Sequence, residues 1–233
     1  MTTTIPPRTT DLSILQVAEA REAISQALQT AGSPCMTCSF QAEDMVVLRL
    51  LQEFRPDIPV LFLETGYHFP EMYRYRDQMI ARYGLNLINV EPVRSVATQE
   101  SEFGLLFQTQ PDRCCKFRKV EPLFAALENY DVWFTGLRRV QSPTRANLQV
   151  LDHFPLPSGK QLLKVSPLAA WNDKEVWSFA REHDIPLVPL YDSGYTSIGC
   201  QPCTALPSSS DNARSGRWAG RKLECGIHIA EEH

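Results

Sequence analysis

The stretch PCMTCSFQAEDMVVLRLLQE, residues 34–53, decides the fold, because a short apolar run passes directly into a helical pattern. Residues 34–40 are predicted to form a buried strand, and residues 42–53 the helix that follows it. The free N–H groups at the start of such a helix can hold a phosphate, and Ser39 can donate one further hydrogen bond. On pattern alone an ordinary strand-to-helix cap is the favoured interpretation, since the glycines and the lysine of a Walker A loop are missing.

The alternation of strand-like and helical segments continues beyond this stretch. Further strands are predicted at residues 59–65, 85–91 and 131–137, and helices near residues 70–83 and 116–128. Strands that alternate with helices pair in parallel, because each helix carries the chain back to the same edge of the sheet. The sequence therefore predicts an α/β fold with a mainly parallel sheet and helices on both faces.

The two ends of the chain depart from this alternation. Apolar residues at helical spacing predict a leading amphipathic helix over residues 11–30. Residues 149–154 and 161–165 are predicted to pair as a hairpin or at a sheet edge, and residues 172–183 to form the last helix. The segment after Pro186 is rich in proline, serine and glycine, yet it holds three of the seven cysteines and a basic run. We expect it to be a functional tail that folds over the sheet.

Length and composition favour one globular domain, since 233 residues of which 43% are hydrophobic can bury a sizeable core. Its parts are a leading helix (1–33), an α/β nucleotide-binding core (34–185) and the tail (186–233). The net charge of -4 argues against broad nucleic-acid binding. The first residues lack the apolar core of a signal peptide, and no apolar run can span a bilayer, so a cytoplasmic protein is expected. In that reducing compartment, structural disulfides explain seven cysteines poorly.

Two more polar loops follow predicted strands: LETGYHFP at residues 63–70 and TGLRRVQS at residues 135–142. Because the carboxyl ends of parallel strands meet at one edge, these loops and the loop at Ser39 are expected to line a single crevice. The planar guanidinium of arginine suits phosphate or sulfate oxygens, although most arginines are simply solvated. We expect Arg145 to bind such an anion.

The strongest local signal is the pairing of Cys114-Cys115 with Cys200 and Cys203, because four thiolates from two distant loops make an all-cysteine metal site. Adjacent cysteines fit the usual zinc spacing poorly, and neither pair matches a ferredoxin pattern. Spacing alone leaves zinc and an iron-sulfur cluster equally open, with reduced free thiols as a third alternative. Basic residues flank the first pair, and residues 214–222 form a second basic run; a solvated basic face and an anionic substrate both remain open for these charges.

The remaining cysteines differ in their surroundings. Cys225 lies in ECGIH, residues 224–228, close to arginines, a lysine and a histidine, which favour the reactive thiolate. Cys35 and Cys38 lie within a predicted strand, where their side chains point in opposite directions. We expect these two to be buried core thiols that do not form a redox pair.

Taken together, these motifs resemble the assimilatory sulfonucleotide reductases, specifically the iron-sulfur adenosine 5′-phosphosulfate (APS) reductases. The resemblance covers nearly the whole chain after Pro34 and rests on several motifs in order. They are SFQAEDM, LETGYHFPE, CC-x-x-RK, GLRR-x-QS with Arg145, GC-x-x-C, and GRW followed by ECGIH.

The resemblance implies an adenine-nucleotide α-hydrolase-like fold with a modified phosphate loop, and one 4Fe-4S cluster on Cys114, Cys115, Cys200 and Cys203. It also implies an oxidoreductase of sulfate assimilation and cysteine biosynthesis, in which Cys225 attacks the sulfate sulfur of APS. AMP then leaves, an S-sulfocysteine forms, and thioredoxin or a similar dithiol releases sulfite. The fixed charges expected to offset the repulsion between thiolate and sulfate come from Lys119, Arg145, Arg214 and Arg217. The expected substrate-binding residues are Ser39, Lys119, Arg145, Arg214, Arg217 and His228.

Two departures from the family pattern accompany this resemblance. The chain ends eight residues after Cys225 without a thioredoxin-like extension, so the reductant is expected to be a separate protein. The loop before Arg145 is one residue shorter than the common bacterial pattern, which weakens the alignment of that arginine. A homo-oligomer is expected only because relatives commonly form one.

Three alternatives remain open on the sequence. Reduction of 3′-phosphoadenosine 5′-phosphosulfate (PAPS), or use of both substrates, is the nearest, because the sequence does not identify a 3′-phosphate pocket. A non-catalytic metal-binding regulator would not need the Cys225 thiol. An adenylating or tRNA-thiolating enzyme of the same fold would usually carry a Ser-Gly-Gly loop, which this chain lacks, and the acidic charge balance gives no support for tRNA.

Overall fold

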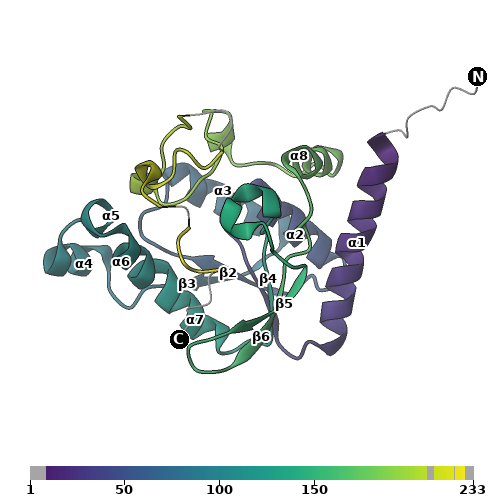
Figure 1. Ribbon diagram of the computed structural model, residues 1–233, viewed down its shortest axis with the longest axis horizontal. Helices are drawn as coiled ribbons and strands as arrows, with labels where there is room; N and C mark the ends of the chain where they lie inside the picture. The colour runs from purple at the N-terminus through teal and green to yellow at the C-terminus, as the bar shows by residue number, and fades with distance from the viewer. Residues whose placement is uncertain (1–8, 209–212, 223, 229–233) are drawn as a thin grey trace, which may run out of the picture.

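A computed structural model describes residues 9–208, 213–222 and 224–228, with side chains described from residue 14 onward (Figure 1). The chain opens with α1 (Thr9–Thr30), the long purple helix at one side of the sheet. This element confirms the predicted leading helix. None of the helices in the described part of the chain combines the length and the apolar character that a membrane span requires.

A six-stranded sheet in the order β3-β2-β1-β4-β6-β5 forms the centre of the fold. Its strands are β1 (Pro34–Thr37), β2 (Pro59–Leu63), β3 (Asn86–Val90), β4 (Val132–Phe134), β5 (Leu151–Pro155) and β6 (Gln161–Val165). All neighbours pair in parallel except β5 and β6, which form the predicted antiparallel hairpin at one edge. β1, β2 and β4 end before the predicted limits, because the chain leaves the sheet there to form the loops of the site.

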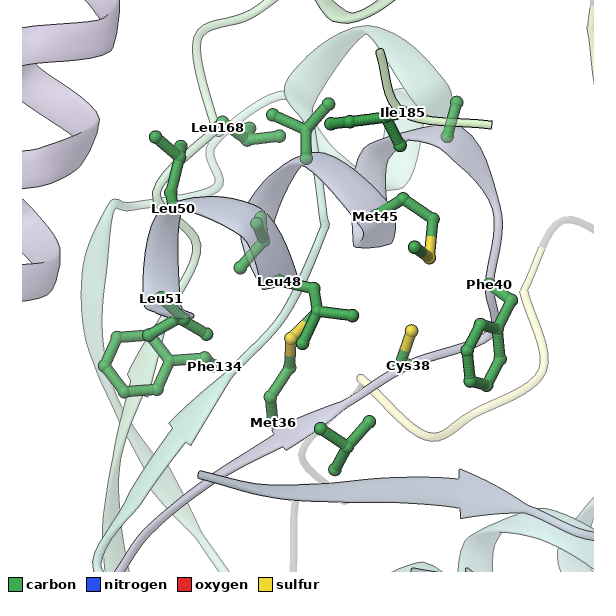
Figure 2. Close-up of a cluster of buried hydrophobic side chains, with 14 of the residues drawn as sticks. Met36, Cys38, Phe40, Met45, Leu48, Leu50, Leu51, Phe134, Leu168 and Ile185 are labelled. Carbon is green, nitrogen blue, oxygen red and sulfur yellow. The ribbon is translucent and has the colours of Figure 1, made fainter. Parts of the chain in front are cut away.

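The two faces of the sheet bury different side chains, as the alternation of a strand requires. Met36 and Phe134 point toward α2 (Ala42–Gln52), and this core also includes residues of α3 (Pro70–Tyr83) and α8 (Asp173–Glu182) (Figure 2). On the opposite face, Cys35 and Trp133 belong to a smaller core with α7 (Glu121–Leu127). Helices therefore cover both faces, as the sequence predicted.

The cysteines of β1 and the loop after it follow the same alternation. Cys35 lies in the smaller core and Cys38 in the larger one, and both are buried. Burial raises the pKa of both thiols, and the nearby carboxylates of Asp131 for Cys35 and Asp44 for Cys38 raise it further. This confirms that they are core thiols on opposite faces of the sheet.

The segment from residue 96 to residue 127 differs from the prediction of one helix near residues 116–128. The chain forms α4 (Val96–Phe103), α5 (Leu106–Thr109) and α6 (Pro111–Cys115), then a π-helical turn at Lys116–Val120 before α7. Each hydrogen bond of a π-helix spans one residue more than a hydrogen bond of an α-helix. The side chains of this turn therefore face directions that a regular α-helix would not give them. The predicted helix near residues 116–128 is confirmed, although its first turn is π-helical, and α4 and α5 were missed because they are short.

The tail beyond α8 has only single turns of 3₁₀-helix among its described residues, at Pro189–Tyr191, Gln201–Cys203 and Trp218–Gly220. It is drawn in yellow-green and yellow over the loops of the sheet in Figure 1. Backbone N–H groups of the tail bind this edge: Ile198 donates to the side chain of Gln41 at 2.7 Å, and Gln201 donates to the carbonyl of Tyr67 at 2.6 Å. The prediction that the tail folds over the sheet is confirmed.

Candidate active site

The loop after β1 is fixed by hydrogen bonds to the carboxylate of Asp44. The backbone N–H and the hydroxyl of Ser39 both donate to Asp44 Oδ2 at 2.6 Å. A side chain at Gly136 would overlap with Asp44, so the loop after β4 packs directly against this carboxylate. Burial raises the pKa of Asp44 to about 7. Asp44 therefore joins two of the three loops that the sequence placed at this edge.

These loops and the tail surround one partly open cavity. Its lining includes Ser39 from the first loop, His68 from the second and Gly136 from the third, which confirms the predicted crevice. Of the predicted site residues, the cavity brings together Ser39, Lys119, Arg145, Arg214, Arg217 and Cys225. Residues more than 180 positions apart in the sequence thus face one space.

The other two arginines of the third loop have structural partners. Arg138 lines the cavity, but its Nη2 donates to Asp173 of α8 at 2.7 Å. Arg139 donates to the carbonyl of Leu148 at 2.8 Å and does not line the cavity. Arg145, which follows this loop, also lines the cavity, and it contacts the tail.

His228 lies outside the cavity lining. Its ring stacks on Trp133, with centroids 5.4 Å apart and planes at 18°, and its carbonyl accepts a hydrogen bond from Lys164 at 3.3 Å. Burial lowers the pKa of the His228 imidazole, and the nearby Lys164 ammonium lowers it further. A neutral ring fixed against β4 anchors the end of the described tail, which differs from the direct substrate contact expected from the sequence.

Arg145 meets a residue that sequence analysis did not single out. Its Nε and Nη2 donate to the two oxygens of Glu224 at 2.9 and 2.8 Å, and Arg214 lies 3.7 Å from the same carboxylate. Burial opposes charge on Glu224, but the hydrogen bond and the charge of Arg145 hold its pKa below the usual value. The only sequence signal for this role was the position of Glu224 beside Cys225.

The four predicted metal ligands line a second, smaller cavity. Cys114 and Cys115 come from the end of α6, and Cys200 and Cys203 from the tail. Burial and the neighbouring thiols raise the pKa of Cys114 to about 12, and burial also raises that of Cys203. Buried thiols of this kind resist ionisation unless a cation lies beside them, and four thiols around one space are a donor set that suits a metal group.

The spread of these thiols distinguishes between kinds of metal group. Among the described residues, no three His, Cys, Asp or Glu side chains are close enough together to hold a single metal ion. A tetrahedral zinc ion needs four sulfurs at about 2.3 Å from one centre. In a cluster each cysteine binds a different iron, so the sulfurs stand further apart. The described residues therefore show four cysteines around one cavity without a preformed site for a single zinc ion.

The two cavities share a wall. Lys119, Arg217 and Trp218 line both of them. Burial disfavours charge on Lys119, but negative charge on the thiolates of Cys200 and Cys225 raises the pKa of its ammonium above the usual value. Trp218 is buried beneath the guanidinium of Arg217 at 4.4 Å. Positive charge is thus fixed between Cys225 and the four-cysteine cavity.

Comparison with known families places the chain. Residues 33–206 match the family described as "Phosphoadenosine phosphosulfate reductase domain". The chain belongs to this family. The matched region runs from β1 through the Cys200 and Cys203 pair, so it includes the sheet, the three loops and the start of the tail of this chain.

One relative of this chain is the "Adenosine 5′-phosphosulfate reductase" of Rhodococcus opacus. It is 42% identical over 227 residues, which cover 93% of this chain and 91% of the relative. The enzyme of Rhodococcus erythropolis with the same name is 46% identical over 190 residues, covering 81% of this chain and 76% of the relative. The similarity therefore extends across the tail as well as the core.

Solved structures support the fold. The crystal structure of phosphoadenylyl-sulfate reductase from Candida auris superposes with a TM-score of 0.68 at 24% identity, covering 87% of this chain and all of that chain. The FMN adenylyltransferase of Candida glabrata superposes with a TM-score of 0.65 at 15% identity, covering 89% and 70%. At these identities the likeness establishes the fold alone. It confirms the adenine-nucleotide α-hydrolase-like architecture expected from the sequence.

Proposed function

We propose that this protein reduces adenosine 5′-phosphosulfate to sulfite and AMP in sulfate assimilation, with Cys225 as the nucleophile. The observation that carries the proposal is a cavity that holds a thiol together with Lys119, Arg145, Arg214 and Arg217. A dianionic or trianionic nucleotide can be held there by fixed positive charge. The curated relatives named above carry the same activity in their names.

The first half of the proposed reaction transfers the sulfonate group. The Cys225 thiolate attacks the sulfate sulfur, an S–S bond forms, and the bond from sulfur to the bridging oxygen breaks, so AMP leaves with that oxygen. The product on the enzyme is S-sulfocysteine. Because both reactants are anionic, their approach needs cations that are already in place; Lys119 and Arg217 stand on the wall beside Cys225.

The second half consumes a dithiol such as thioredoxin. One of its thiolates attacks the sulfur of Cys225, sulfite leaves, and a mixed disulfide forms between the two proteins. The second thiol of the dithiol then resolves this bond, which restores Cys225 and leaves the partner oxidised. The tail would have to present Cys225 to the partner at this stage; among its described residues, few backbone–backbone hydrogen bonds to the core would have to break.

We also propose that Cys114, Cys115, Cys200 and Cys203 hold one 4Fe-4S cluster. When bound, the cluster supplies electrostatic and structural support beside the cavity. Polar side chains lie beside these sulfurs: Gln99 Nε2 donates to Cys114 Sγ at 3.9 Å, and the Cys200 thiol donates to Thr65 Oγ1 at 3.4 Å. Lys119 and Arg217 separate it from Cys225.

Reduction of PAPS is the second candidate, because the family name and the Candida auris structure both refer to that substrate. The four cysteines around one cavity favour APS. Competition of the two nucleotides at equal concentration decides between them. A clear preference for PAPS would overturn the assignment.

The central test is the Cys225→Ser protein, purified without oxygen. We expect sulfite release from APS with thioredoxin to disappear, because serine is a far weaker nucleophile than a thiolate. Iron content, with about four irons per chain, and AMP binding are expected to stay at the wild-type level. Wild-type protein with zinc in place of iron, or sulfite release by Cys225→Ser, would contradict the proposal.

A further inference from the structure

The carboxylate of Glu224 is buried between two cavity arginines. Its side chain is 7% exposed, and the side chains of Arg145 and Arg214 are 11% and 19% exposed. Glu224 does not itself line the cavity, whereas both arginines do. The carboxylate therefore stands behind the guanidinium groups and leaves their other side toward the space where a substrate anion would lie.

The hydrogen bonds fix the arginine in direction as well as in position. Arg145 uses Nε and Nη2 for a two-point contact with Glu224, and its Nη1 donates to Gln141 Oε1. The hydroxyl of Thr144 donates to the same carboxylate at 3.0 Å. A two-point contact sets the plane of a guanidinium, which a single ion pair does not.

The same contact crosses from the core to the tail. Arg145 belongs to the turn after β4, and Glu224 lies 79 residues later, directly before Cys225. The anchor on the other side of Cys225 is His228, stacked on Trp133 of β4. The thiol is thus held between two fixed points that lie one residue before it and three residues after it.

We propose that Glu224 is a positioning residue that latches the tail, so that the arginines facing the cavity and the Cys225 thiol are set by one shared contact. The inference rests on the proposed role of Cys225 as the nucleophile. An anion bound by Arg145 would meet a guanidinium group already oriented by Glu224, with the charge of Arg214 held near the same carboxylate. Loss of the carboxylate would free the tail and the arginines together.

The experiment measures access to Cys225 without any turnover of substrate. Cluster-loaded wild-type protein and Glu224→Gln are treated without oxygen with a neutral alkylating reagent across a range of pH, and modification of Cys225 is followed by peptide mass spectrometry. The plateau rate at high pH reports access, while the midpoint reports the electrostatic surroundings of the thiol. We expect the plateau rate of Glu224→Gln to rise at least about fivefold, because breaking a buried pair opens the segment that it holds. Glu224→Asp, which keeps the charge, is expected to restore part of the protection.

A matched control comes from another two-point pair of the same chain. Arg21 Nε and Nη2 donate to Glu53 at 2.7 and 2.9 Å, and this pair lies on the surface of α1 and the end of α2. Glu53→Gln should leave the plateau rate unchanged. A plateau rate of Glu224→Gln equal to wild type would overturn the latch, even if Cys225→Ser abolishes sulfite release. Absence of sulfite release from wild type, with the expected rise in Glu224→Gln, would overturn the proposed function and leave the latch in place.

Discussion

At the scale of single residues, the site depends on charges that burial makes costly. Asp44 faces the cavity and receives both donors of Ser39, so its carboxylate shapes the loop that is expected to bind phosphate. Burial raises its pKa to about 7, above the value of about 4 for an unfolded aspartate. Between these two values the folded protein holds a proton that the unfolded chain has lost.

This difference predicts a pH-dependent loss of stability. The contribution of Asp44 is most favourable below the unfolded pKa and falls as pH rises through about 7. Because the carboxylate is only partly buried and cavity solvent screens it, we expect a loss of about 1 kcal/mol between pH 5 and pH 8. Thermal unfolding of wild type and Asp44→Asn over that range tests it. The variant should be less stable overall but should lack this slope; parallel curves would contradict the prediction.

At the scale of elements, the π-helical turn at Lys116–Val120 connects the cysteine cavity to the rest of the fold. The turn buries Arg118, whose guanidinium donates to the carbonyl of Thr65, to that of Arg94 at 3.1 Å and to Gln99 Oε1 at 3.4 Å. One side chain thus ties the loop after β2 and the start of α4 to the segment that carries Cys114 and Cys115.

Arg118→Met should therefore weaken the metal site without touching a thiol. The three acceptors lose their donor inside the protein, which we expect to cost about 3 kcal/mol of stability. Iron should be lost to a chelator faster than from wild type. Lys116→Met, an exposed change in the same turn, is the control and should stay within about 0.5 kcal/mol of wild type. Equal rates of iron loss in Arg118→Met and wild type would show that the contacts do not support the site.

At the scale of the whole molecule, an acidic chain concentrates positive charge in one place. The net charge is -4, yet the cavity gathers Lys119, Arg145, Arg214 and Arg217. Glu224 neutralises part of this charge, and the acidic residues Glu43, Asp44 and Asp173 line other parts of the cavity. A local positive field in a negative protein attracts small anions and disfavours nucleic acids, whose binding needs a broad basic surface.

The field predicts a dependence on salt. We expect KM for APS to rise roughly threefold to tenfold between about 50 mM and 500 mM potassium chloride, because mobile ions screen the partly exposed arginines. The value of kcat should change far less, since the cations next to Cys225 act within the closed site. Steady-state kinetics at several salt concentrations measure both. A salt-independent KM would show that the arginines do not bind the nucleotide.

Assembly also belongs to this scale and stays a prediction. A homo-oligomer is expected because relatives commonly form one. The N-terminal part of α1 leaves Ile14 and Leu15 exposed by 65% and 56%. Light scattering of the purified protein measures the oligomeric state.

The sequence by itself indicated most of the elements and the residues that are expected to carry the chemistry. Residues 34–53 indicated the strand and helix at the centre of the sheet, because local periodicity records which face of an element is buried. The two cysteine pairs, Cys225 and the basic runs were identified by residue type and spacing, which depend on short distances along the chain. The short helices α4 and α5 and the π-helical turn escaped this reasoning, because they are too short to show a period.

Only the tertiary structure decided which of these groups meet. It placed His228 against Trp133 instead of in the cavity, and it joined Arg145 to Glu224 across 79 residues. It also spread the four cysteines around one space, where no single ion is within reach of three described ligands. The physical reason is that charge pairing and ring stacking depend on the distance between loops in space. That distance is set by the sheet order and by the path of the tail, and neither is written in the spacing of residues along the chain.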